Sequence, residues 1–403
     1  MAKKTINKEL TGAQDLYNFL FEACNIIRGP VSQDNFKDYI TPLLYYKRIS
    51  DVYDEETEEA LISSGGDKEY ASLPEQHRFV IPDGCHWQEV RERTENLGAA
   101  IVGAMRQIEI ANPDTLYGVL SMFSSQKWTN KAILNDSKIR DLIEHLSKRK
   151  LGNKDYPADL MGDAYEILLK KFADDSKAQA GEFYTPRSVV RLLVHILDPQ
   201  PGETVYDPAC GSGGMLIEAI RYMHDDSLCC GSIFGQEKNV VNAAIAKMNL
   251  FLHGASDFNV MQGDTLRDPK ILQGGNIAKF DCVIANPPFS LENWGATEWS
   301  SDKYKRNIYG TPSDSCGDYA WIQHMICSMS SGKGRMAVVM PQGILFRGNQ
   351  EAEIRKQLVE SDLIEAVVTL GDKLFYGTGL SPCFLIIRRM KQAHHSGRIL
   401  MID

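Results

Sequence analysis

An asparagine followed by two prolines and a phenylalanine is the part of the sequence whose residue types best suit a chemical step. Asn286, Pro287, Pro288 and Phe289 come directly after the apolar run Cys282–Ala285. The exocyclic amine of an adenine is a weak nucleophile, because its lone pair is delocalised into the ring. The Asn286 side-chain oxygen and the Pro287 carbonyl could accept both amine hydrogens and stabilise the positive charge that develops during alkylation, and Phe289 could stack on the base. A strand that merely ends in a Pro-Pro turn has the same sequence, so the motif alone leaves both interpretations open.

The element that must position this motif is a short buried strand. Four apolar residues before a breaker indicate a strand of a parallel sheet. Proline has no N–H group for a sheet ladder, so the strand is expected to stop at Asn286. In open α/β sheets, ligands bind beyond the carboxyl ends of the strands. The motif is therefore expected at the usual position of a ligand site.

A glycine turn follows another short strand earlier in the chain. Residues 204–206 are expected to form that strand, and Asp207 leads into a turn and then a helix near Met215. This order is that of the first unit of a nucleotide-binding α/β sheet. A dinucleotide fingerprint would need a glycine in place of Leu216, and a carboxylate at Asp207 suits a ligand with an ammonium group better than a pyrophosphate. The residues of the turn are Gly211, Ser212, Gly213 and Gly214.

Two further acids follow the next two expected strands. Glu237 comes after a strand at 232–234, where a carboxylate can accept from both hydroxyls of a ribose. Asp264 comes after a strand at 259–261 and could accept from an adenine amine. Either acid alone is more often a surface carboxylate, but acids at successive strand ends favour a ligand site.

A helix start precedes the glycine turn. Thr185 before Pro186 indicates an N-cap followed by the first helical position. The free N–H groups and the positive dipole end of such a helix can bind a carboxylate, although a cap needs no function.

The polar segment 290–317 follows the Asn-Pro-Pro-Phe motif. Mixed aromatic and basic side chains suit contact with a nucleic-acid strand, and a mobile surface loop with chance aromatics is an equally weighted alternative. The side chains concerned are Trp294, Trp299, Lys303, Lys305, Arg306 and Tyr309.

Length and composition bound the remaining possibilities. The chain has 403 residues, 43% of them hydrophobic, which is enough for a large core and two domains. The nine cysteines show no paired Cys-x-x-Cys spacing, which favours reduced thiols in the cytoplasm over disulfides or a zinc site. No apolar run is long enough to span a bilayer, so no membrane association is expected. The net charge of −9 argues against a chain that holds DNA by itself.

Two kinds of pattern divide the chain. Residues 10–150 are expected to be mostly helical, because apolar residues recur at helical spacing. After them, expected strands alternate with helices, as in a doubly wound sheet. The further expected elements are helices at 240–252, 318–329 and 351–359, and strands at 336–339, 364–370 and 383–387.

Together and in this order, the motifs resemble the modification (M) subunit of Type I restriction–modification systems, an N6-adenine DNA methyltransferase of the gamma class. The resemblance extends over nearly the whole chain. Asp207–Gly214 is similar to the family's Asp-Pro-x-x-Gly-x-Gly-Gly loop, and Asn286–Phe289 matches its catalytic tetrapeptide. Glu237 and Asp264 match its ribose and adenine acceptors. The segment that in this family holds the methionine end of S-adenosylmethionine is matched by Gly181, Glu182, Phe183, Tyr184, Thr185, Pro186 and Arg187.

The resemblance implies a fold, an activity and partners. The expected fold is α/β, an S-adenosylmethionine-dependent methyltransferase domain (Rossmann-like, mostly parallel sheet) at 156–403 after an N-terminal all-α domain at 1–155. The implied reaction moves a methyl group from S-adenosylmethionine to N6 of an adenine flipped out of DNA, without a metal. The implied partners are DNA, a specificity (S) subunit, a second M subunit and a restriction (R) subunit. Family members continue into a C-terminal helical region, and most of it is expected to be missing, since the sequence stops at Leu400–Asp403 inside an expected element.

Three interpretations of function remain open at this point. Asn-Pro-Pro-aromatic motifs also occur in methyltransferases that act on a protein glutamine or on RNA. A catalytically inactive scaffold subunit is the third interpretation. Methyl transfer to DNA is the expectation that the complete set of motifs favours.

Overall fold

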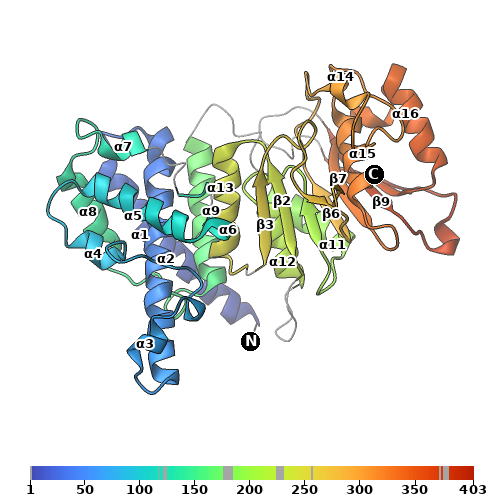
Figure 1. The fold of residues 1–403 in the computed structure, drawn as a ribbon. Coiled ribbons are helices and arrows are strands. Elements are labelled where there is room, and N and C mark those ends of the chain that lie inside the picture. Colours follow the sequence, from blue (N-terminus) through green and yellow to red (C-terminus); the bar gives the residue numbers. More distant parts are fainter. Residues whose placement is uncertain are drawn as a thin grey trace. The chain divides into compact units, whose positions relative to one another are not determined.

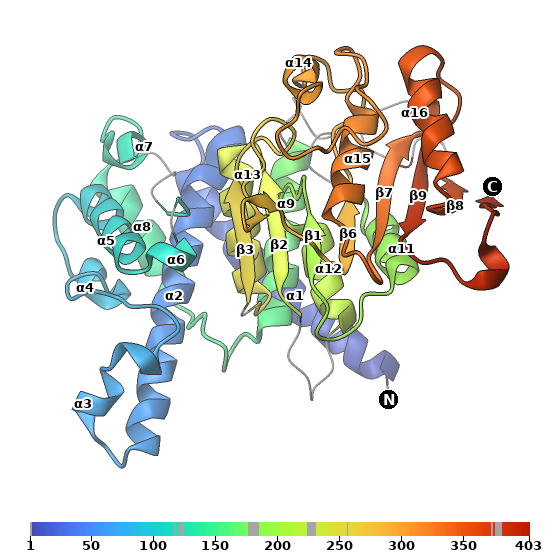
Figure 2. The ribbon, with the colours of Figure 1, turned by 45° about the vertical axis from the view of Figure 1, so that its right-hand side comes forward.

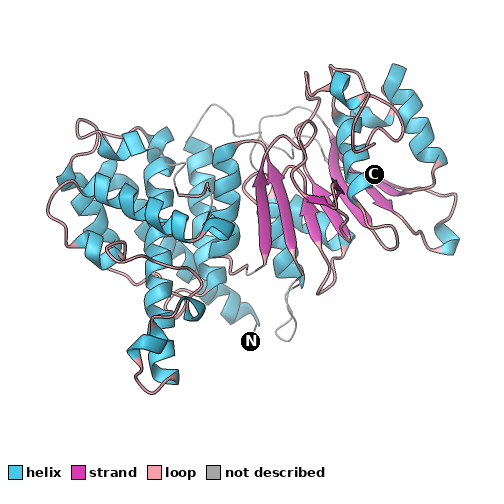
Figure 3. Ribbon diagram, viewed as in Figure 1, coloured by secondary structure: helices cyan, strands magenta, loops and turns pink. Residues whose placement is uncertain are grey.

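The computed structural model describes residues 2–116, 118–120, 125–175, 185–223, 231–255, 257–371, 374 and 381–403. The chain forms two compact units, Met1–Ala178 with Lys247–Gly254, and Gln179–Ala246 with Ala255–Asp403 (Figure 1). We call them the helical unit and the sheet unit. In the described part of the chain, all strands belong to the sheet unit (Figure 3). The expected fold class, an α/β domain after an all-helical region, is confirmed.

The helical unit is built around one long buried helix, α2. Every residue from Tyr39 to Val52 in α2 is buried, including three charged side chains. Lys47 pairs with Asp51 one turn later, and Arg48 donates to the Tyr156 carbonyl at 2.9 Å. These partners satisfy charges that would otherwise be costly to bury. The helices are α1 (Ala2–Ile27), η1 (Gln33–Asn35), α2 (Phe36–Ser63), α3 (Lys68–Ala71), η2 (Pro74–Gln76), α4 (Trp87–Arg91), α5 (Leu97–Ala111), α6 (Pro113–Leu116), α7 (Ser125–Thr129), α8 (Asp136–Leu146) and α9 (Ala158–Asp175).

By its internal contacts the helical unit also includes α9, and the expected domain boundary at residue 155 stays a prediction. Helix α1 contacts both α8 and α9. Residues 247–254, at the end of helix α13 (Val240–Leu252) and just after it, also belong to this unit.

The sheet unit contains an eight-stranded sheet of order β10-β8-β9-β7-β6-β1-β2-β3 (Figure 2). All neighbouring strands are parallel except β9, which is antiparallel to both β7 and β8. The order reverses between β1 and β6, so the loops that follow these two strands diverge there, where α/β folds bind ligands. The strands are β1 (Val205–Asp207), β2 (Ile233–Glu237), β3 (Phe258–Gln262), β6 (Cys282–Ala285), β7 (Arg335–Pro341), β8 (Ile364–Thr369), β9 (Pro382–Arg388) and β10 (Leu400–Ile402).

Helices pack on both faces of this sheet. Tyr206, Val283 and Val338 lie on the face that forms one hydrophobic cluster with α15 (Asp318–Ser328) and α16 (Asn349–Glu360). The alternate residues Cys282 and Ile284 are also fully buried, and α11 (Arg187–Leu197) contacts β6 and β7. Helix α12 (Gly214–Met223) contacts β1 and β2 beside α11. This burial on both faces explains why β6 is a continuous apolar run.

Several expected elements are confirmed at their bounds. Strand β6 spans Cys282–Ala285 and helix α13 spans Val240–Leu252, as the sequence predicts. The hairpin of β4 (Leu272–Gln273) and β5 (Asn276–Ile277) was not expected, and neither was the antiparallel position of β9 between β7 and β8. Two further short helices, α14 (Ala296–Trp299) and η3 (Gln342–Leu345), follow β6 and β7, and η4 (Ala393–His395) precedes β10.

Across the residues that the structure describes, no helix combines the length and the apolar character needed to cross a membrane.

Candidate active site

Asn286 lies directly beyond the carboxyl end of β6, and its amide is fixed on one side only. Its Nδ2 donates to Thr185 Oγ1 at 2.9 Å. Its Oδ1 is buried, and no group in the described part of the chain donates a hydrogen bond to it. A buried acceptor without a donor is costly in a folded protein unless a ligand or water satisfies it. The amide thus presents an oriented oxygen that is suited to an N–H donor.

The other residues of the tetrapeptide differ in exposure. Pro287 is buried, Pro288 is exposed and Phe289 is half-buried. Ser290 follows with a φ of 51°, in the left-handed region. Its N–H donates to Asp318 Oδ1 at 2.7 Å. The strained residue Ser290, which directly follows the motif, is therefore held by the buried carboxylate of Asp318.

Thr185 has a different role from the one predicted. We expected Thr185 to cap the helix and Pro186 to be its first residue, but α11 begins at Arg187 with Pro186 as its N-cap residue and no side-chain cap bond. The N–H groups of Val189 and Val190 bond to the Pro186 carbonyl. The Thr185 hydroxyl accepts from Asn286 instead. The Thr185 hydroxyl thus binds a side chain that is distant in sequence, which the local pattern could not indicate.

Asp207 ends β1 and is 2% exposed. Its Oδ1 accepts the N–H of Ala209 at 2.9 Å. Burial raises the pKa of Asp207 to about 8; the Ala209 N–H opposes the rise and the nearby charge of Glu237 adds to it. A positively charged ligand group would favour the ionised form of this carboxyl group.

The glycine turn approaches Glu237 at the end of β2. Gly211 has a φ of 55° and Gly213 a φ of 85°. The backbone of any residue other than glycine is strained at such angles. The Gly211 N–H donates to Glu237 Oε2 at 2.9 Å, and the Asn239 N–H donates to Oε1 at 2.7 Å. Burial raises the pKa of Glu237, and these backbone N–H groups oppose the rise. Ser212 is half-buried beside this carboxylate, and Gly214 is the first residue of α12.

Asp264 begins a turn beyond β3. Its Oδ1 accepts the N–H groups of Leu266 and Arg267, each at 3.2 Å. Its Oδ2 lies 2.9 Å from Lys238 Nζ. The neighbouring Thr265 donates its hydroxyl to the Pro208 carbonyl at 2.6 Å, so the turn is attached to the loop that follows β1. Asp207, Glu237 and Asp264 thus all lie at carboxyl strand ends, as the sequence predicts.

In the long segment after β6, three of the six side chains that we considered for contact with a nucleic-acid strand are interior. Trp294, Trp299 and Arg306 are each 2% exposed, so they cannot stack on a nucleic-acid strand. The two indole rings pack edge to face with their centroids 5.5 Å apart, and the Arg306 guanidinium lies 4.4 Å from the Trp299 ring centroid. These three side chains are therefore interior packing, whereas Lys303 and Lys305 are exposed and Tyr309 is half-buried.

Residues that the sequence did not indicate complete the support of the site. Asp318 is 1% exposed, and its Oδ2 accepts from Arg347 at 2.7 Å while its Oδ1 holds Ser290. Arg347 also pairs with Glu351 at 2.9 Å. The only signal in the sequence was a carboxylate at the start of an expected helix, which is a common position for a solvated acid.

An exposed aromatic residue lies beyond the neighbouring strand β7. Phe346 directly follows η3 and is 73% exposed, although it is large and apolar. Its backbone is fixed on both sides, because the Tyr319 hydroxyl donates to the Ile344 carbonyl at 2.7 Å and Arg355 donates to the Arg347 carbonyl at 2.8 Å. An exposed phenyl ring whose neighbouring backbone is held in this way is suited to a flat ligand.

Four residues of the segment matched to the family, Gly181, Glu182, Phe183 and Tyr184, lie outside the described residues. Arg187, the last residue of the segment Gly181–Arg187, is exposed at the start of α11.

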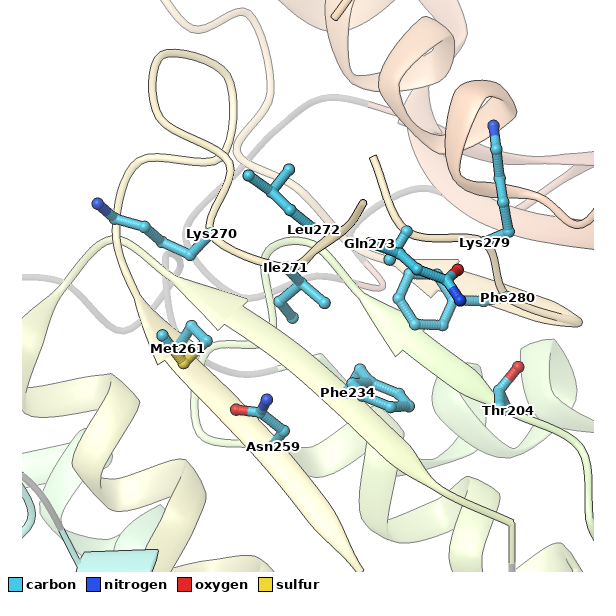
Figure 4. Close-up of a pocket in the computed structure, with 11 residues that line it drawn as sticks. Thr204, Phe234, Asn259, Met261, Lys270, Ile271, Leu272, Gln273, Lys279 and Phe280 are labelled. Atoms are coloured by element: carbon cyan, nitrogen blue, oxygen red, sulfur yellow. The ribbon is translucent and has the colours of Figure 1, made fainter. Parts of the chain in front are cut away.

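A hollow of about 410 Å³ lies elsewhere in the sheet unit and contains none of the predicted site residues. Phe234 and Asn259 line it from strands, and Ile271 and Leu272 line it from the segment that crosses over them (Figure 4). Thr204 and Lys279 place it towards the amino ends of β1 and β6. Its position is on the sheet face rather than at the carboxyl strand ends, so we do not assign it to the site.

Comparison with known proteins decides the family. A family model described as N-6 DNA methylase matches residues 156–403. The chain belongs to the N-6 DNA methylase family. A second model, described as the HsdM N-terminal domain, matches residues 16–146 of this family member. The resemblance inferred from the motifs is confirmed.

Curated relatives are similar over most of the chain. The MjaVII methylase subunit of a type I restriction enzyme from Methanocaldococcus jannaschii is 34% identical over 379 residues, covering 89% of this chain and 63% of the relative. The MjaVIII methylase subunit from the same organism is 33% identical over 422 residues, covering 98% of this chain and 68% of the relative. The chain therefore spans about two thirds of the length of these relatives.

A solved structure has the same architecture. The methyltransferase subunit of a type I restriction–modification system from Streptococcus thermophilus superposes with a TM-score of 0.79 at 26% identity, over 94% of this chain and 85% of that one.

Proposed function

We propose that this chain transfers a methyl group from S-adenosylmethionine to N6 of an adenine in DNA, as the modification subunit of a type I restriction–modification complex. The observation that supports this most is the orientation of Asn286. Thr185 holds its Nδ2, while its buried Oδ1 receives no hydrogen bond from the described residues. This orphaned acceptor lies at the start of the Asn-Pro-Pro-Phe motif, where a primary amine would satisfy it.

The residues at the carboxyl strand ends fit S-adenosylmethionine. Glu237 would accept from the ribose hydroxyls, since the Gly211 and Asn239 N–H groups bond to its two oxygens and a carboxylate has about four acceptor positions. Gly211, whose N–H binds Glu237, has no side chain that could lie between this carboxylate and a ligand. The buried Asp207 suits a cationic group. Asp264 would accept a hydrogen bond from the adenine amine of the cofactor, which would replace Lys238 as the partner of this carboxylate.

The remaining predicted residues have roles that rest on the family resemblance. Glu182, Phe183, Tyr184, Thr185, Pro186 and Arg187 would surround the methionine end of the cofactor, with Ser212 and Gly214 beside it. Thr185 would thus contact both the cofactor and Asn286, which suits a residue placed between a methyl donor and an acceptor.

The chain contributes acceptors and orientation to the reaction. S-adenosylmethionine supplies an electrophilic methyl group when it is bound. Asn286 Oδ1 and the Pro287 carbonyl would accept the two amine hydrogens, which directs the nitrogen lone pair towards the methyl carbon. The same two oxygens stabilise the positive charge that forms on the nitrogen, and the proton is lost to solvent after the transfer.

Two phenyl rings are available for the flipped base. Phe289 belongs to the tetrapeptide and is half-buried. Phe346, which directly follows η3 beyond the next strand β7, is 73% exposed. Stacking on aromatic rings offsets part of the cost of removing a base from the duplex.

The expected partners are DNA, a specificity subunit that selects the sequence, a second modification subunit, and a restriction subunit in the full complex. The names of the relatives, methylase subunits of type I restriction enzymes, support a multisubunit assembly. The described cysteines are free thiols, which is consistent with the cytoplasmic location that we expect for such an enzyme.

The decisive experiment is transfer of a tritiated methyl group from S-adenosylmethionine to DNA, RNA and protein, with and without the specificity subunit. Transfer to adenine N6 of DNA in the presence of the partner is the expected result. Transfer to RNA or to a protein glutamine would replace the proposal with that alternative. Cofactor binding without transfer to any of the three would indicate a scaffold subunit.

A further inference from the structure

Two loops that follow different strands are joined by arginine side chains, and the arginine of each loop donates to backbone carbonyl groups of the other. We call residues 263–270, which follow β3, the β3 loop, and residues 290–317, which follow β6, the β6 loop. Arg306 of the β6 loop donates to the Thr265 carbonyl at 2.9 Å and to the Leu266 carbonyl at 2.8 Å. Both acceptors directly follow Asp264 in the β3 loop.

The reverse bond comes from Arg267 of the β3 loop, which donates to the Asn293 carbonyl of the β6 loop at 2.5 Å. Gly295 has a φ of 105°, and a Cβ atom there would lie 3.1 Å from Arg267 Cγ. The stem of Arg267 therefore lies against the backbone of the β6 loop. Each loop thus supplies one cation to the other loop's carbonyl groups.

The Arg306 bonds are buried and charge-assisted. Asp302 accepts from Arg306 Nε at 2.9 Å and from Nη2 at 2.8 Å, and these side chains are 2% and 7% exposed. Buried ion pairs of this kind contribute more to a specific geometry than to net stability. The pair orients the guanidinium towards the β3 loop.

The β6 loop needs such support because its backbone is strained. Ser290, Asn293 and Lys305 have φ values of 51°, 51° and 56°. These angles are unfavourable for residues other than glycine. Arg267 binds the carbonyl of one of these residues. Strained backbone persists only where the surroundings hold it.

We propose that Arg267 and Arg306 join the β3 loop and the β6 loop into a single frame, so that the cofactor side at Asp264 and the target side at Asn286–Phe289 are positioned together. Arg267 is then a positioning residue for the reaction, although it touches neither reactant. This inference rests on the proposed function for the roles of the two sides, but the frame itself can be tested without any ligand.

The first test is hydrogen exchange of the ligand-free protein, followed by mass spectrometry. Arg267→Met removes an exposed cation, and we expect about 10-fold faster exchange in both the β3 and β6 loops, as one charge-assisted hydrogen bond is lost. The matched control is Arg389→Met, because Arg389 also donates to a backbone carbonyl, that of Ile326 at 2.6 Å, outside both loops. Faster exchange in the β3 loop alone, or in neither loop, overturns the proposal.

The second test adds S-adenosylmethionine at a saturating concentration. In the wild-type protein we expect slower exchange in both loops, and in Arg267→Met slower exchange in the β3 loop alone. The transfer rate of this variant should fall about 10-fold through misplacement of the target side, and Arg267→Lys should restore part of it. Retained protection of the β6 loop in Arg267→Met contradicts the proposal. Absence of methyl transfer by the wild-type protein together with the specificity subunit would contradict the proposed function, while the ligand-free exchange would still decide whether the frame exists.

Discussion

Asn286 and Thr185 are 101 residues apart in the sequence, and a hydrogen bond of 2.9 Å joins their side chains. This bond connects the segment before α11 with the turn after β6. Because Thr185 accepts from Nδ2, it determines which atom of the Asn286 amide is left for another donor. An acceptor that is oriented before the substrate arrives requires no reorganisation during the reaction.

Replacement of Asn286 by alanine should abolish methyl transfer and leave cofactor affinity nearly unchanged. Loss of one preorganised partner of the transition state costs about 100-fold or more in rate. Single-turnover transfer and calorimetry with S-adenosylmethionine measure the two effects separately. Asn276→Ala, an exposed position in β5, is the control and should change neither. Near-normal turnover of Asn286→Ala would remove the central assignment.

Thr185→Ala should lower the transfer rate at saturating cofactor by less than Asn286→Ala does, about 10-fold, because the amide loses its anchor but keeps its oxygen. Thr185→Ser retains the hydroxyl group and should keep most of the activity. Equal activity of the alanine and serine variants would show that the bond between Thr185 and Asn286 has no role in orientation. Thermal unfolding of both variants checks that α11 is intact.

The sequence predicted the strands of this site better than it predicted the contacts between them. An apolar run that ends at prolines determines β6 to the residue, and a carboxylate before glycines locates the end of β1. Thr185 was interpreted from its neighbour Pro186 alone, since local patterns contain no information on a partner 101 positions away. Antiparallel β9 was missed for a similar reason, because its pairing with both β7 and β8 depends on long-range register.

Glu237→Ala should weaken binding of S-adenosylmethionine at least about 10-fold, since hydrogen bonds to a charged acceptor contribute about 1.5–3 kcal/mol each. The carboxylate also accepts from Gly211, so the glycine turn loses a contact as well. Calorimetry on the chain alone measures the affinity without DNA. Glu360→Ala, an exposed position at the end of α16, is the control. Unchanged affinity of Glu237→Ala would mean that the cofactor binds elsewhere.

Asp207 should make the folded protein less stable as the pH rises. Its pKa is about 8 in the folded state, mainly through burial, against an ordinary value of 3.8. Between these values the folded state binds a proton that the unfolded state has lost, so the free energy of unfolding contributed by this group falls with rising pH. Asp207→Asn removes the contribution, and its stability should fall less than that of the wild-type protein between about pH 5 and pH 8.

Denaturant unfolding at the two pH values measures this difference without the cofactor. Glu292→Gln, at an exposed position in the β6 loop, controls for the loss of one acidic group. Parallel pH dependence of Asp207→Asn and the wild-type protein would show that the Asp207 pKa is not raised.

The β6 loop shows where residue types mislead. Tryptophans with lysines and arginines in a polar segment suggest a nucleic-acid surface, yet Trp294, Trp299 and Arg306 are interior. The hydrogen-bond partners of the buried Arg306 are a carboxylate four residues earlier and two carbonyl groups of another loop. The carboxylate at Asp302 was visible in the sequence, but the carbonyl groups were not, because every segment has them.

The chain alone should bind S-adenosylmethionine but hold DNA weakly and without sequence preference. Its net charge is −9, and the burial of Arg306 leaves Lys303 and Lys305 as the exposed cations among the basic side chains that we had considered in the β6 loop. Neutralised phosphates supply most non-specific affinity, and contacts with base edges supply sequence choice.

Titration of the purified chain with duplexes of different sequence, at about 0.15 M salt, should give a Kd of about 10⁻⁴–10⁻⁶ M for all of them. Addition of the specificity subunit should produce tight and selective binding, because that partner would both select the sequence and hold the duplex while an adenine is flipped towards Asn286. Tight, sequence-selective binding by the chain alone would instead indicate a self-sufficient methyltransferase that needs no specificity subunit.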